Sequence, residues 1–467
     1  MLTRRHFLGS AAFSVAAVRA EGPSAVGNSL PAADYDLVVA GGSATGVCAA
    51  VTAARQGLKV ALVEYNAFFG GMATAALVPV WHSLYSTDGK TQIIGGLTDE
   101  IERRMLARGE AELKGNRADP SVGCYLNVAA LQLTLDEFVR AEKGITSYLK
   151  AHVVDAVCDR PGHVVAAVVE DKSGRHLLRA NYFIDATGDA DLAARAGFAT
   201  WTLPKCDLQA HTLCAIVSGV DDLHKVYGGK FNLNAILRPD SGAGLKHVFG
   251  WTAPVVGGTK NLRFIAATRI ASCDPSIAAD LTEGLFEGRD QLRRIVDTVN
   301  RNFPMPDGRR MALVAIGSDL GVRESRHIKA RYKVTEKDVL HGRHFDDCIG
   351  KGSYRVDIHE GTGITFRYLN GKEDVMTTTP EGQVTWKHRR WRSYEGPYPT
   401  WYEIPFSAMV PENAENLVCA GRMIDCERAA FGALRVMVNC NQMGEAAGRA
   451  AANALKRGLK AAAAYAG

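Results

Sequence analysis

The most constraining feature of the chain is a glycine-rich turn between two apolar segments near its N-terminus. Residues 34–40 form a short apolar run suited to a buried parallel strand, and residues 58–63 form a second run that ends at Glu64. Between them, residues 47–56 show an alanine-rich helical pattern that stops before Gly57. The turn consists of Gly41, Gly42, Ser43, Ala44, Thr45 and Gly46. This order predicts a doubly wound, Rossmann-like α/β domain whose turn holds the phosphates of a dinucleotide.

Each part of this unit has a predicted physical role. Gly41 permits a tight turn, and Gly46 allows the helix to pack close to the first strand. The start of the helix offers N–H groups and the positive end of its dipole to a pyrophosphate. Glu64 can accept hydrogen bonds from the adenosine ribose, and its charge disfavours a 2′-phosphate. Ser43 replaces the usual middle glycine, and its hydroxyl could donate to a phosphate oxygen. The alternative is an α/β turn of the same shape that binds no phosphate.

A second glycine pair, Gly70 and Gly71, lies within residues 65–74. A nicotinamide site does not need this pair, whereas a flavin needs close backbone approach around its ribityl chain and ring. Here the chain resembles FAD-dependent oxidoreductases of the glutathione-reductase-like superfamily. One group of them reads GG-x-x-AG in the turn and FLGG-x-AT after the acid; Thr45 and Phe69 depart slightly from these patterns. The resemblance implies FAD contacts at Tyr65, Gly70, Gly71, Met72, Ala73 and Thr74.

The resemblance continues beyond residue 140. Residues 145–149 and 152–157 are expected to be strands, and the adenine contact of the family falls on the backbone of Val153 or Val154. Residues 164–179 alternate around a Lys-Ser-Gly turn and predict a β-hairpin.

Residues 182–189 match the Ala-Thr-Gly motif of the same superfamily, where the chain passes near the cofactor. The implied contacts are Ala186, Thr187, Gly188 and Asp189. Asp185 and Asp189 could instead cap the helix expected at residues 192–196.

The last matching segment lies near the C-terminus. Residues 416–420 are expected to be a buried strand, and a long helix rich in Ala and Gly is expected to run to about Leu455. The family's AGR and G-x-x-RVM motifs imply cofactor contacts at Gly421, Arg422, Arg435, Val436 and Met437. In this resemblance the start of the helix faces the flavin pyrimidine and stabilises negative charge there. Arg435 is also a candidate catalytic residue, with a salt-bridge role as the alternative.

These matches divide the chain into parts. Residues 34–204 and 405–467 predict a bipartite FAD-binding domain, and residues 205–404 predict an inserted, strand-rich α+β substrate domain over the flavin. Two stretches of the inserted part, residues 321–326 and 352–359, resemble the GVRESRR and GSYPIDIH segments of the family.

Candidate catalytic residues follow from the chemistry that a flavin performs. A flavin that oxidises an alcohol or amine accepts a hydride while a base takes a proton. His82 and His359 are the candidate bases, although each could be a hydrogen-bonded core histidine. Arg323 and Arg326 could orient a substrate carboxylate, or they could tie the two domains together through Glu324.

An aromatic-rich stretch precedes the return to the FAD-binding domain. It contains Trp386, Trp391, Tyr394, Tyr398, Trp401 and Tyr402. Aromatic faces suit sugar rings, but the edge of a core or interface explains them too.

Several functional classes have no support in the sequence. The ten cysteines contain no C-x-x-C pair, and His341-x-x-His344 is read as a polar turn, so no metal site is predicted. The formal net charge of +5 is small for 467 residues and its charge runs are short, so a nucleic-acid partner is not expected.

The first twenty residues have the layout of a cleavable export signal. Arg4 and Arg5 precede a short apolar stretch and a small-residue site at residues 18–20. Residues 3–8 resemble a twin-arginine leader, which implies the twin-arginine export machinery as a partner and a periplasmic location. A loose linker is expected at residues 21–33, and no stable membrane span is expected because the apolar part is too short. A disordered cytosolic N-terminus with a chance arginine pair is the alternative.

The function that the sequence predicts is an FAD-dependent oxidoreductase. It is expected to take a hydride from a small polar substrate, with a carbohydrate-like compound as one option, onto flavin N5. The electron acceptor is unknown. A reductase using an external electron donor, or a non-enzymatic flavin-binding protein, is the alternative.

Overall fold

The computed structural model describes residues 30–115, 122–233, 244–245, 250–257, 261–361, 363–379, 383–393 and 396–465. The predicted export signal at residues 1–20 lies outside these residues, as does most of the predicted linker. The end of that linker was placed wrongly, because strand β1 already begins at Ala32.

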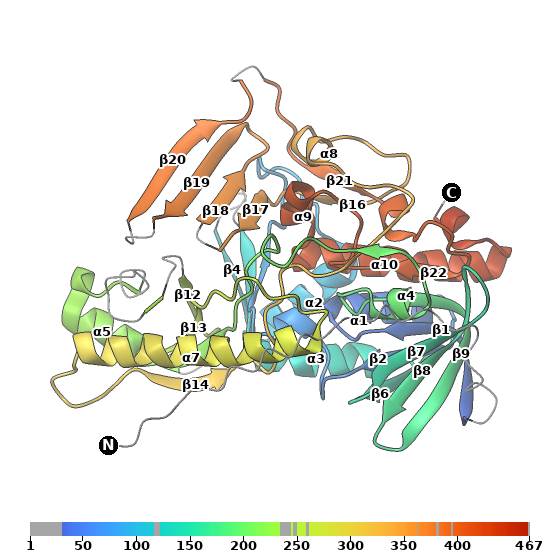
Figure 1. The fold of residues 1–467 in the computed structure, drawn as a ribbon, viewed down its shortest axis with the longest axis horizontal. Coiled ribbons are helices and arrows are strands. Elements are labelled where there is room, and N and C mark those ends of the chain that lie inside the picture. The colour runs from blue at the N-terminus through green and yellow to red at the C-terminus, as the bar shows by residue number, and fades with distance from the viewer. Residues whose placement is uncertain are drawn as a thin grey trace, which may run out of the picture.

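A seven-stranded sheet forms the centre of one half of the molecule (Figure 1). Its parallel strands, in spatial order, are β6 (Ile145–Leu149), β2 (Val60–Glu64), β1 (Ala32–Ala40), β9 (Gly174–Asp185) and β22 (Leu417–Cys419). The first half of β9 pairs antiparallel with β8 (His163–Asp171), which is followed in the sheet by β7 (His152–Arg160). The end of β9 pairs with β22, so the C-terminal part of the chain completes a sheet begun near its N-terminus.

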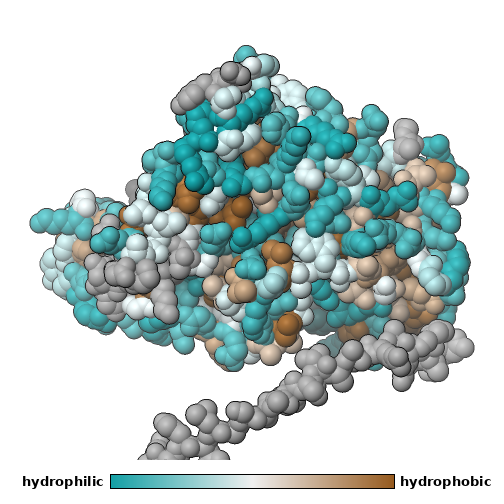
Figure 2. Space-filling view, turned by 45° about the horizontal axis from the view of Figure 1, so that its top comes forward, coloured by the Kyte–Doolittle hydropathy of each residue, from teal (hydrophilic) through white to brown (hydrophobic). Residues whose placement is uncertain are grey.

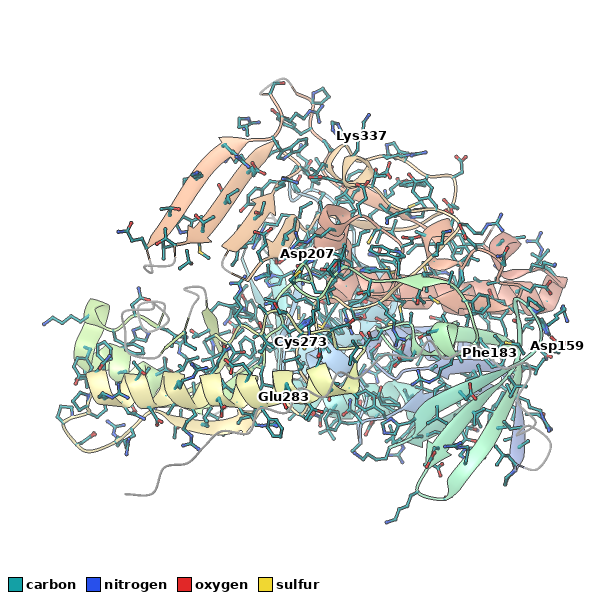
Figure 3. All side chains as sticks on the ribbon, viewed as in Figure 1. Asp159, Phe183, Asp207, Cys273, Glu283 and Lys337 are labelled. Atoms are coloured by element: carbon teal, nitrogen blue, oxygen red, sulfur yellow. The ribbon has the colours of Figure 1, made fainter. Side chains whose placement is uncertain are left out.

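Strand β2 and the second half of β1 form where the sequence predicted strands because their residues are apolar and do not alternate with polar ones. Every residue of β2 is buried, and so are the last four residues of β1. The predicted β-hairpin is confirmed, since β8 and β9 pair around the Lys-Ser-Gly turn. The structure differs in one respect: residues 174–185 form a single long strand, because the hairpin strand runs straight on into the Ala-Thr-Gly segment. Figure 3 labels Phe183, a fully buried residue in that continuation.

The N-terminal helix α1 (Ala44–Arg55) packs closely against the C-terminal helix α10 (Met437–Arg457). A Cβ atom added at Gly444 would lie 2.1 Å from the carbonyl oxygen of Thr45, and one at Gly448 would lie 2.5 Å from that of Ala49. Glycines at these two positions therefore allow the helix backbones to touch. The remaining elements of this half are α2 (Gly96–Ala107), α3 (Val128–Ala141), α4 (Asp191–Arg195), α9 (Arg428–Leu434) and a small sheet of β3 (Val80–His82), β5 (Gly123–Leu126) and β4 (Ala111–Lys114).

The other half contains two antiparallel sheets that lie apart in Figure 1. The first has the order β12 (Trp251–Pro254), β13 (Leu262–Ala266), β11 (Ala215–Ser218) and β14 (Ala312–Ile316). The second has the order β17 (Val356–His359), β18 (Gly363–Arg367), β19 (Lys372–Thr378) and β20 (Val384–Arg390). Shorter elements are α5 (Val220–Tyr227), α8 (Glu336–Leu340), the pair β10 (Thr200–Trp201) with β15 (His327–Ile328), and the pair β16 (Cys348–Gly352) with β21 (Tyr402–Pro405).

A helix of 25 residues, α7 (Ala278–Asn302), crosses the first of these sheets. The strand-rich prediction for this region missed it. Leu292, Val296 and Val299 on one face of α7 pack into the core of the sheet, whereas Glu283, labelled in Figure 3, lies exposed on the helix. Among the described residues, no helix combines the length and the apolar character needed to cross a bilayer. The face shown in Figure 2 is mainly hydrophilic, with hydrophobic residues in small separate patches.

Candidate functional site

The glycine turn after β1 is fixed by close backbone packing. Gly41 has a φ of +98°, and an added Cβ atom would lie 2.5 Å from the carbonyl oxygen of Ala186. At Gly46 an added Cβ atom would lie 1.8 Å from the carbonyl oxygen of Gly41. Glycine is therefore required at both positions so that β1, β9 and α1 can meet at one point.

Ser43, the departure from the usual glycine pattern, begins helix α1. Its hydroxyl oxygen accepts a hydrogen bond from the N–H of Gly46 at 3.4 Å, and it is the N-cap of the helix. Ala44 and Thr45, in the first turn, face the cavity described below. The positive end of the α1 dipole therefore lies at this cavity.

Glu64, at the end of β2, is held by backbone donors on both of its carboxylate oxygens. The N–H of Gly42 donates to Oε2 at 2.7 Å, and the N–H of Asn66 donates to Oε1 at 2.8 Å. The side chain is only 3% exposed, and burial raises the pKa of this carboxyl. The carboxylate is thus fixed in one orientation at the edge of the cavity.

The second glycine pair lies against the first turn. The N–H of Gly70 donates to the carbonyl of Gly42 at 2.9 Å, and an added Cβ atom at Gly71 would lie 2.9 Å from the Cβ atom of Ser43. Both glycines have positive φ angles, +116° and +53°. The Thr74 hydroxyl donates to a backbone carbonyl at 2.8 Å and supports this loop from the protein side.

The segment that follows β9 crosses the same cavity. Asp185 is fully buried and accepts hydrogen bonds from the N–H groups of Thr187 at 3.0 Å and Ala193 at 2.9 Å. The alternative role predicted for Asp185, capping the following helix, is therefore confirmed. Asp189 does not cap this helix but pairs with Arg422 at 3.2 Å.

The C-terminal motif brings a further glycine and an arginine to the cavity. Gly421 has a φ of +122°, and an added Cβ atom would be in ordinary van der Waals contact with the side chains of Met423 at 3.7 Å and Thr45 at 3.9 Å, so the backbone angle and not a lack of room favours glycine here. Nη1 of Arg422 is buried without a hydrogen-bond partner among the described residues. The expected single helix is interrupted: α9 ends at Leu434, and a new helix, α10, begins at Met437 with Val436 at its N-cap position.

Together these segments enclose a cavity of about 450 Å³, called the first cavity below. The predicted cofactor residues that line it are Gly41, Ser43, Ala44, Thr45, Glu64, Tyr65, Gly70, Gly71, Met72, Val153, Val154, Ala186, Thr187, Gly188, Asp189, Gly421, Arg422, Arg435 and Met437. Five predicted residues do not line it: Gly42, Gly46, Ala73, Thr74 and Val436. The first four support the loops around the cavity, and Val436 lines a neighbouring cavity.

Asn441 on α10, which was not predicted from the sequence, also lines the first cavity. It is fully buried, yet neither its side-chain oxygen nor its nitrogen has a partner among the described residues. A buried amide without partners is costly, so this side chain is suited to a polar ligand group. The spacing of four residues from Met437 places it one helical turn further along α10, which was the available signal.

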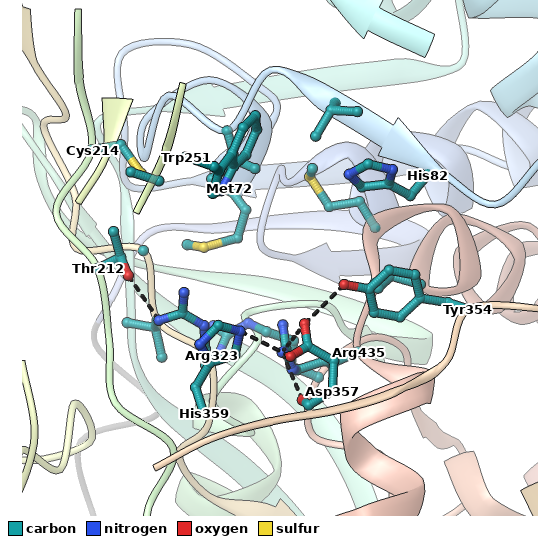
Figure 4. A pocket seen from close by; sticks show the side chains of 18 of the residues that line it. Met72, His82, Thr212, Cys214, Trp251, Arg323, Tyr354, Asp357, His359 and Arg435 are labelled. Carbon is teal, nitrogen blue, oxygen red and sulfur yellow. Dashed lines mark hydrogen bonds and ion pairs between the residues drawn. The ribbon is translucent and has the colours of Figure 1, made fainter. Parts of the chain in front are cut away.

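A second cavity of about 330 Å³ adjoins the first (Figure 4). All four predicted catalytic residues, His82, His359, Arg323 and Arg435, line it. The two cavities share Met72, Val322, Arg422, Arg435 and Met437 as a common wall. In the view of Figure 4, His82 and Trp251 lie on one side of the cavity, whereas Arg323 and His359 lie on the other.

Asp357, which the sequence analysis did not single out, is the centre of the polar network in the second cavity. It accepts a hydrogen bond from the hydroxyl of Tyr354 at 2.8 Å, and it lies 2.9 Å from Nε2 of His359 and 3.3 Å from Nη2 of Arg435 (Figure 4). Although burial opposes the charged form, His359 and two arginines hold the pKa of Asp357 well below its usual range. Burial and the neighbouring Arg323 lower the pKa of His359 to about 3, so this imidazole is neutral at pH 7.

Some candidates from the sequence lie elsewhere. Arg326 pairs with Asp191, donates to the backbone of Asp189 and lines neither cavity, so the hypothesis that it orients a substrate carboxylate is wrong. Glu324 accepts a hydrogen bond from the N–H of Gln209 at 3.0 Å and forms no ion pair with Arg323 or Arg326. The hypothesis that these arginines tie the two domains together through Glu324 is therefore also wrong.

The aromatic stretch, which ends at the first residue of β21, does not reach the second cavity. Among its described members, Tyr402 is fully buried and Trp386 is 44% exposed, and no described member lines either cavity. Tyr394 lies outside the described residues. The aromatic residues that line the second cavity are Tyr125, Trp251, Phe264, Tyr354 and Phe366.

The model of the FAD dependent oxidoreductase family matches residues 36–464 of this chain. The match spans nearly all of the sequence, so the chain belongs to this family, and it is an enzyme that binds FAD. A comparison with curated protein sequences finds no match.

Among solved structures, the chain is similar to a geranylgeranyl bacteriochlorophyll reductase-like protein from Thermoplasma acidophilum, with 14% identity, coverage of 91% of this chain and 80% of that chain, and a TM-score of 0.44. It is also similar to p-nitrophenol 4-monooxygenase from Pseudomonas putida, with 10% identity, coverage of 93% of this chain and 83% of that chain, and a TM-score of 0.44. Neither similarity is high enough to carry an argument about this chain.

The residues of the first cavity fit FAD. Glu64, the start of α1 and Gly421 line this cavity, and Arg435 and Met437 lie at the wall shared with the second cavity. The unpartnered Nη1 of Arg422 and the unpartnered amide of Asn441 supply hydrogen-bonding groups that a polar ligand would satisfy. When bound, the flavin supplies two-electron redox chemistry.

Asn441→Leu is expected to weaken FAD binding about two- to twelvefold, because the variant loses one neutral hydrogen bond, worth about 0.5–1.5 kcal/mol net. The apoprotein should not lose stability, since the amide that leucine replaces is buried and unpartnered. Titration of apoprotein with FAD and thermal melts of the apoprotein measure the two effects. Equal FAD affinity in the variant and parent would show that Asn441 does not contact the cofactor.

Proposed function

We propose that the enzyme oxidises a small polar substrate bound in the second cavity by transferring a hydride to N5 of FAD bound in the first. The substrate loses the hydride and a proton, and an external acceptor, such as oxygen, a quinone or a redox protein, takes the two electrons from the cofactor. The observation that carries this proposal is the common wall of the two cavities, which brings a separate cavity with charged side chains against the expected flavin position. The aromatic stretch that first suggested a carbohydrate-like substrate lies outside the cavity and does not support that option.

The residues of the second cavity support His82 as the proton acceptor. Nε2 of His359 lies 2.9 Å from Oδ1 of Asp357, and Nδ1 lies 3.5 Å from Nη2 of Arg269, so both ring nitrogens face charged groups. A pKa of about 3 also makes His359 a weak base at pH 7. His82 is half-buried on the opposite side of the cavity, with its ring centroid 6.1 Å from that of Tyr354. We assign His359 a positioning role for Asp357 and Arg435.

Anaerobic stopped-flow mixing of the purified enzyme with a library of alcohols, amines and hydroxy acids tests the proposed reaction. Direct bleaching of the flavin absorbance by one class of substrate is expected. With that substrate, His82→Gln should slow reduction about 10²–10⁴-fold and abolish the pH dependence of the rate, as loss of a general base does. Flavin reduction by NADH alone would support the alternative reductase, and reduction by no compound would support a binding protein.

We further propose that the enzyme belongs to the glutathione-reductase-like group, with residues 205–404 as a substrate domain inserted in a bipartite FAD-binding domain. The return of β22 to the sheet of β1 supports this division. We also propose that residues 1–20 are a twin-arginine leader and that the enzyme works in the periplasm. Export in the folded state would suit an enzyme that acquires FAD in the cytoplasm.

Replacing both Arg4 and Arg5 with lysine is expected to abolish export, while the retained enzyme still contains FAD, because these residues lie before the sheet that forms the cofactor site. Cell fractionation with immunodetection, together with the flavin content of the retained protein, measures both effects. Continued export of the double variant through the general secretion route would show that the twin-arginine assignment is wrong.

A further inference from the structure

The second cavity has an excess of positive charge. Its lining contains five arginines, Arg269, Arg323, Arg355, Arg422 and Arg435, but one carboxylate, Asp357. Arg435 pairs with Asp357, and Arg422 pairs with Asp189 outside the cavity. These two arginines also line the first cavity and lie at the expected flavin.

The other three arginines form no ion pair with a carboxylate among the described residues. Arg355 packs against aromatic rings instead, with its guanidinium carbon 4.3 Å from the ring centroid of Phe366. Arg269 and Arg323 have no such partner for their charge. Buried charged groups are normally paired, so these two cations lack a counter-ion.

The hydrogen bonds of these two arginines hold them at the cavity without neutralising them. Nη1 of Arg323 donates to the hydroxyl of Thr212 at 2.8 Å and to the backbone of Ala210. Nη2 of Arg269 donates to the carbonyl of Gly363 at 2.8 Å, and its buried Nε has no partner among the described residues. Burial and mutual repulsion with Arg435 and Arg269 lower the pKa of Arg323 to about 9, and burial lowers that of Arg269 to about 10.

We propose that the substrate is a small carboxylic acid whose carboxylate is bound by Arg323 and Arg269. This inference rests on the proposed function and names its substrate class. A planar guanidinium matches a carboxylate, and two of them around one cavity can bind both of its oxygens. The aromatic side chains of Trp251, Phe264 and Phe366 leave the remainder of the cavity suited to an apolar carbon skeleton.

Three matched pairs of probes test the charge requirement on the purified holoenzyme: acetate with acetamide, benzoate with benzamide, and phenylacetate with phenylacetamide. Binding is followed by the change in flavin absorbance and by isothermal titration calorimetry. At least one carboxylate should bind ten times or more tightly than its amide and raise the melting temperature of the holoenzyme. If no carboxylate binds more tightly than its amide, the proposal is overturned.

Arg323→Gln and Arg269→Gln locate the binding. Each should weaken the best carboxylate at least tenfold and leave the affinity for its amide nearly unchanged, while Arg301→Gln, at an exposed position on α7, should have no effect. Unchanged carboxylate affinity in both cavity variants would overturn the assignment to these residues. Carboxylate binding that depends on Arg323, in an enzyme whose flavin no compound reduces, would refute the proposed oxidation but not the anion site. Flavin reduction by neutral substrates only, without carboxylate binding, would support the proposed oxidation and refute the anion site.

Discussion

Gly41→Val is expected to abolish FAD binding and to destabilise the protein by about 3 kcal/mol or more, the scale of strained backbone combined with overpacking. The φ of +98° is unfavourable for a β-branched residue, and the Cβ atom would lie 2.5 Å from the carbonyl oxygen of Ala186. The clash is therefore with the end of β9 and not, as the role of such a turn would suggest, with the space for a pyrophosphate. The flavin content per chain and the urea midpoint measure the two effects.

Gly57→Val is the matched control for this variant. Gly57 has a similar φ of +92° at the end of α1, but an added Cβ atom there would meet nothing within 4 Å. This control should lose stability through backbone strain alone and keep its FAD. If Gly41→Val retained as much flavin as Gly57→Val, the close contact between the turn and β9 would not exist.

Glu64→Ala is expected to weaken FAD binding by more than tenfold. A charge-assisted hydrogen bond to the ribose is worth roughly 1.5–3 kcal/mol. The substitution also leaves the N–H groups of Gly42 and Asn66 without their carboxylate, so the turn itself should loosen. Ser43→Gly should have a mild effect on FAD affinity, since replacing a serine N-cap by glycine costs roughly a few tenths of a kcal/mol. Titration of each apoprotein with FAD gives the order.

Asp36→Ala separates the ribose contact from general damage to the sheet. Asp36 also accepts a hydrogen bond from a backbone N–H, that of Lys59 at 2.7 Å, but it does not line the first cavity. Its loss should leave FAD affinity unchanged. Should Glu64→Ala bind FAD as tightly as Asp36→Ala does, the carboxylate would not be at the ribose.

The sequence was sufficient to predict the elements whose cause is local. Apolar runs bounded by glycines predicted β1, β2 and β22 within about two residues, the usual uncertainty of such boundaries. The helix α7 was missed because its buried residues occupy a narrow stripe among many charged ones, and the sheet beneath it is assembled from distant segments.

Only part of the candidate site was predicted, because the sequence shows single residues and not the contacts between distant segments. His82, His359, Arg323 and Arg435 were selected one by one, and the structure brings them to one cavity. Asp357 was missed although it lies two residues from His359, because its importance depends on partners from three other positions in the chain. Charge balance within a cavity is a tertiary property, so the unpaired arginines could not be recognised from sequence spacing.

Mass spectrometry of the cofactor released from purified enzyme by denaturation tests the central claim most directly. The two-cavity arrangement predicts FAD, one per chain, released without cleavage of a covalent bond, because Glu64 and the start of α1 are placed for the adenosine and pyrophosphate of a dinucleotide. Release of FMN alone, or a protein that binds no flavin after incubation with FAD, would contradict the account.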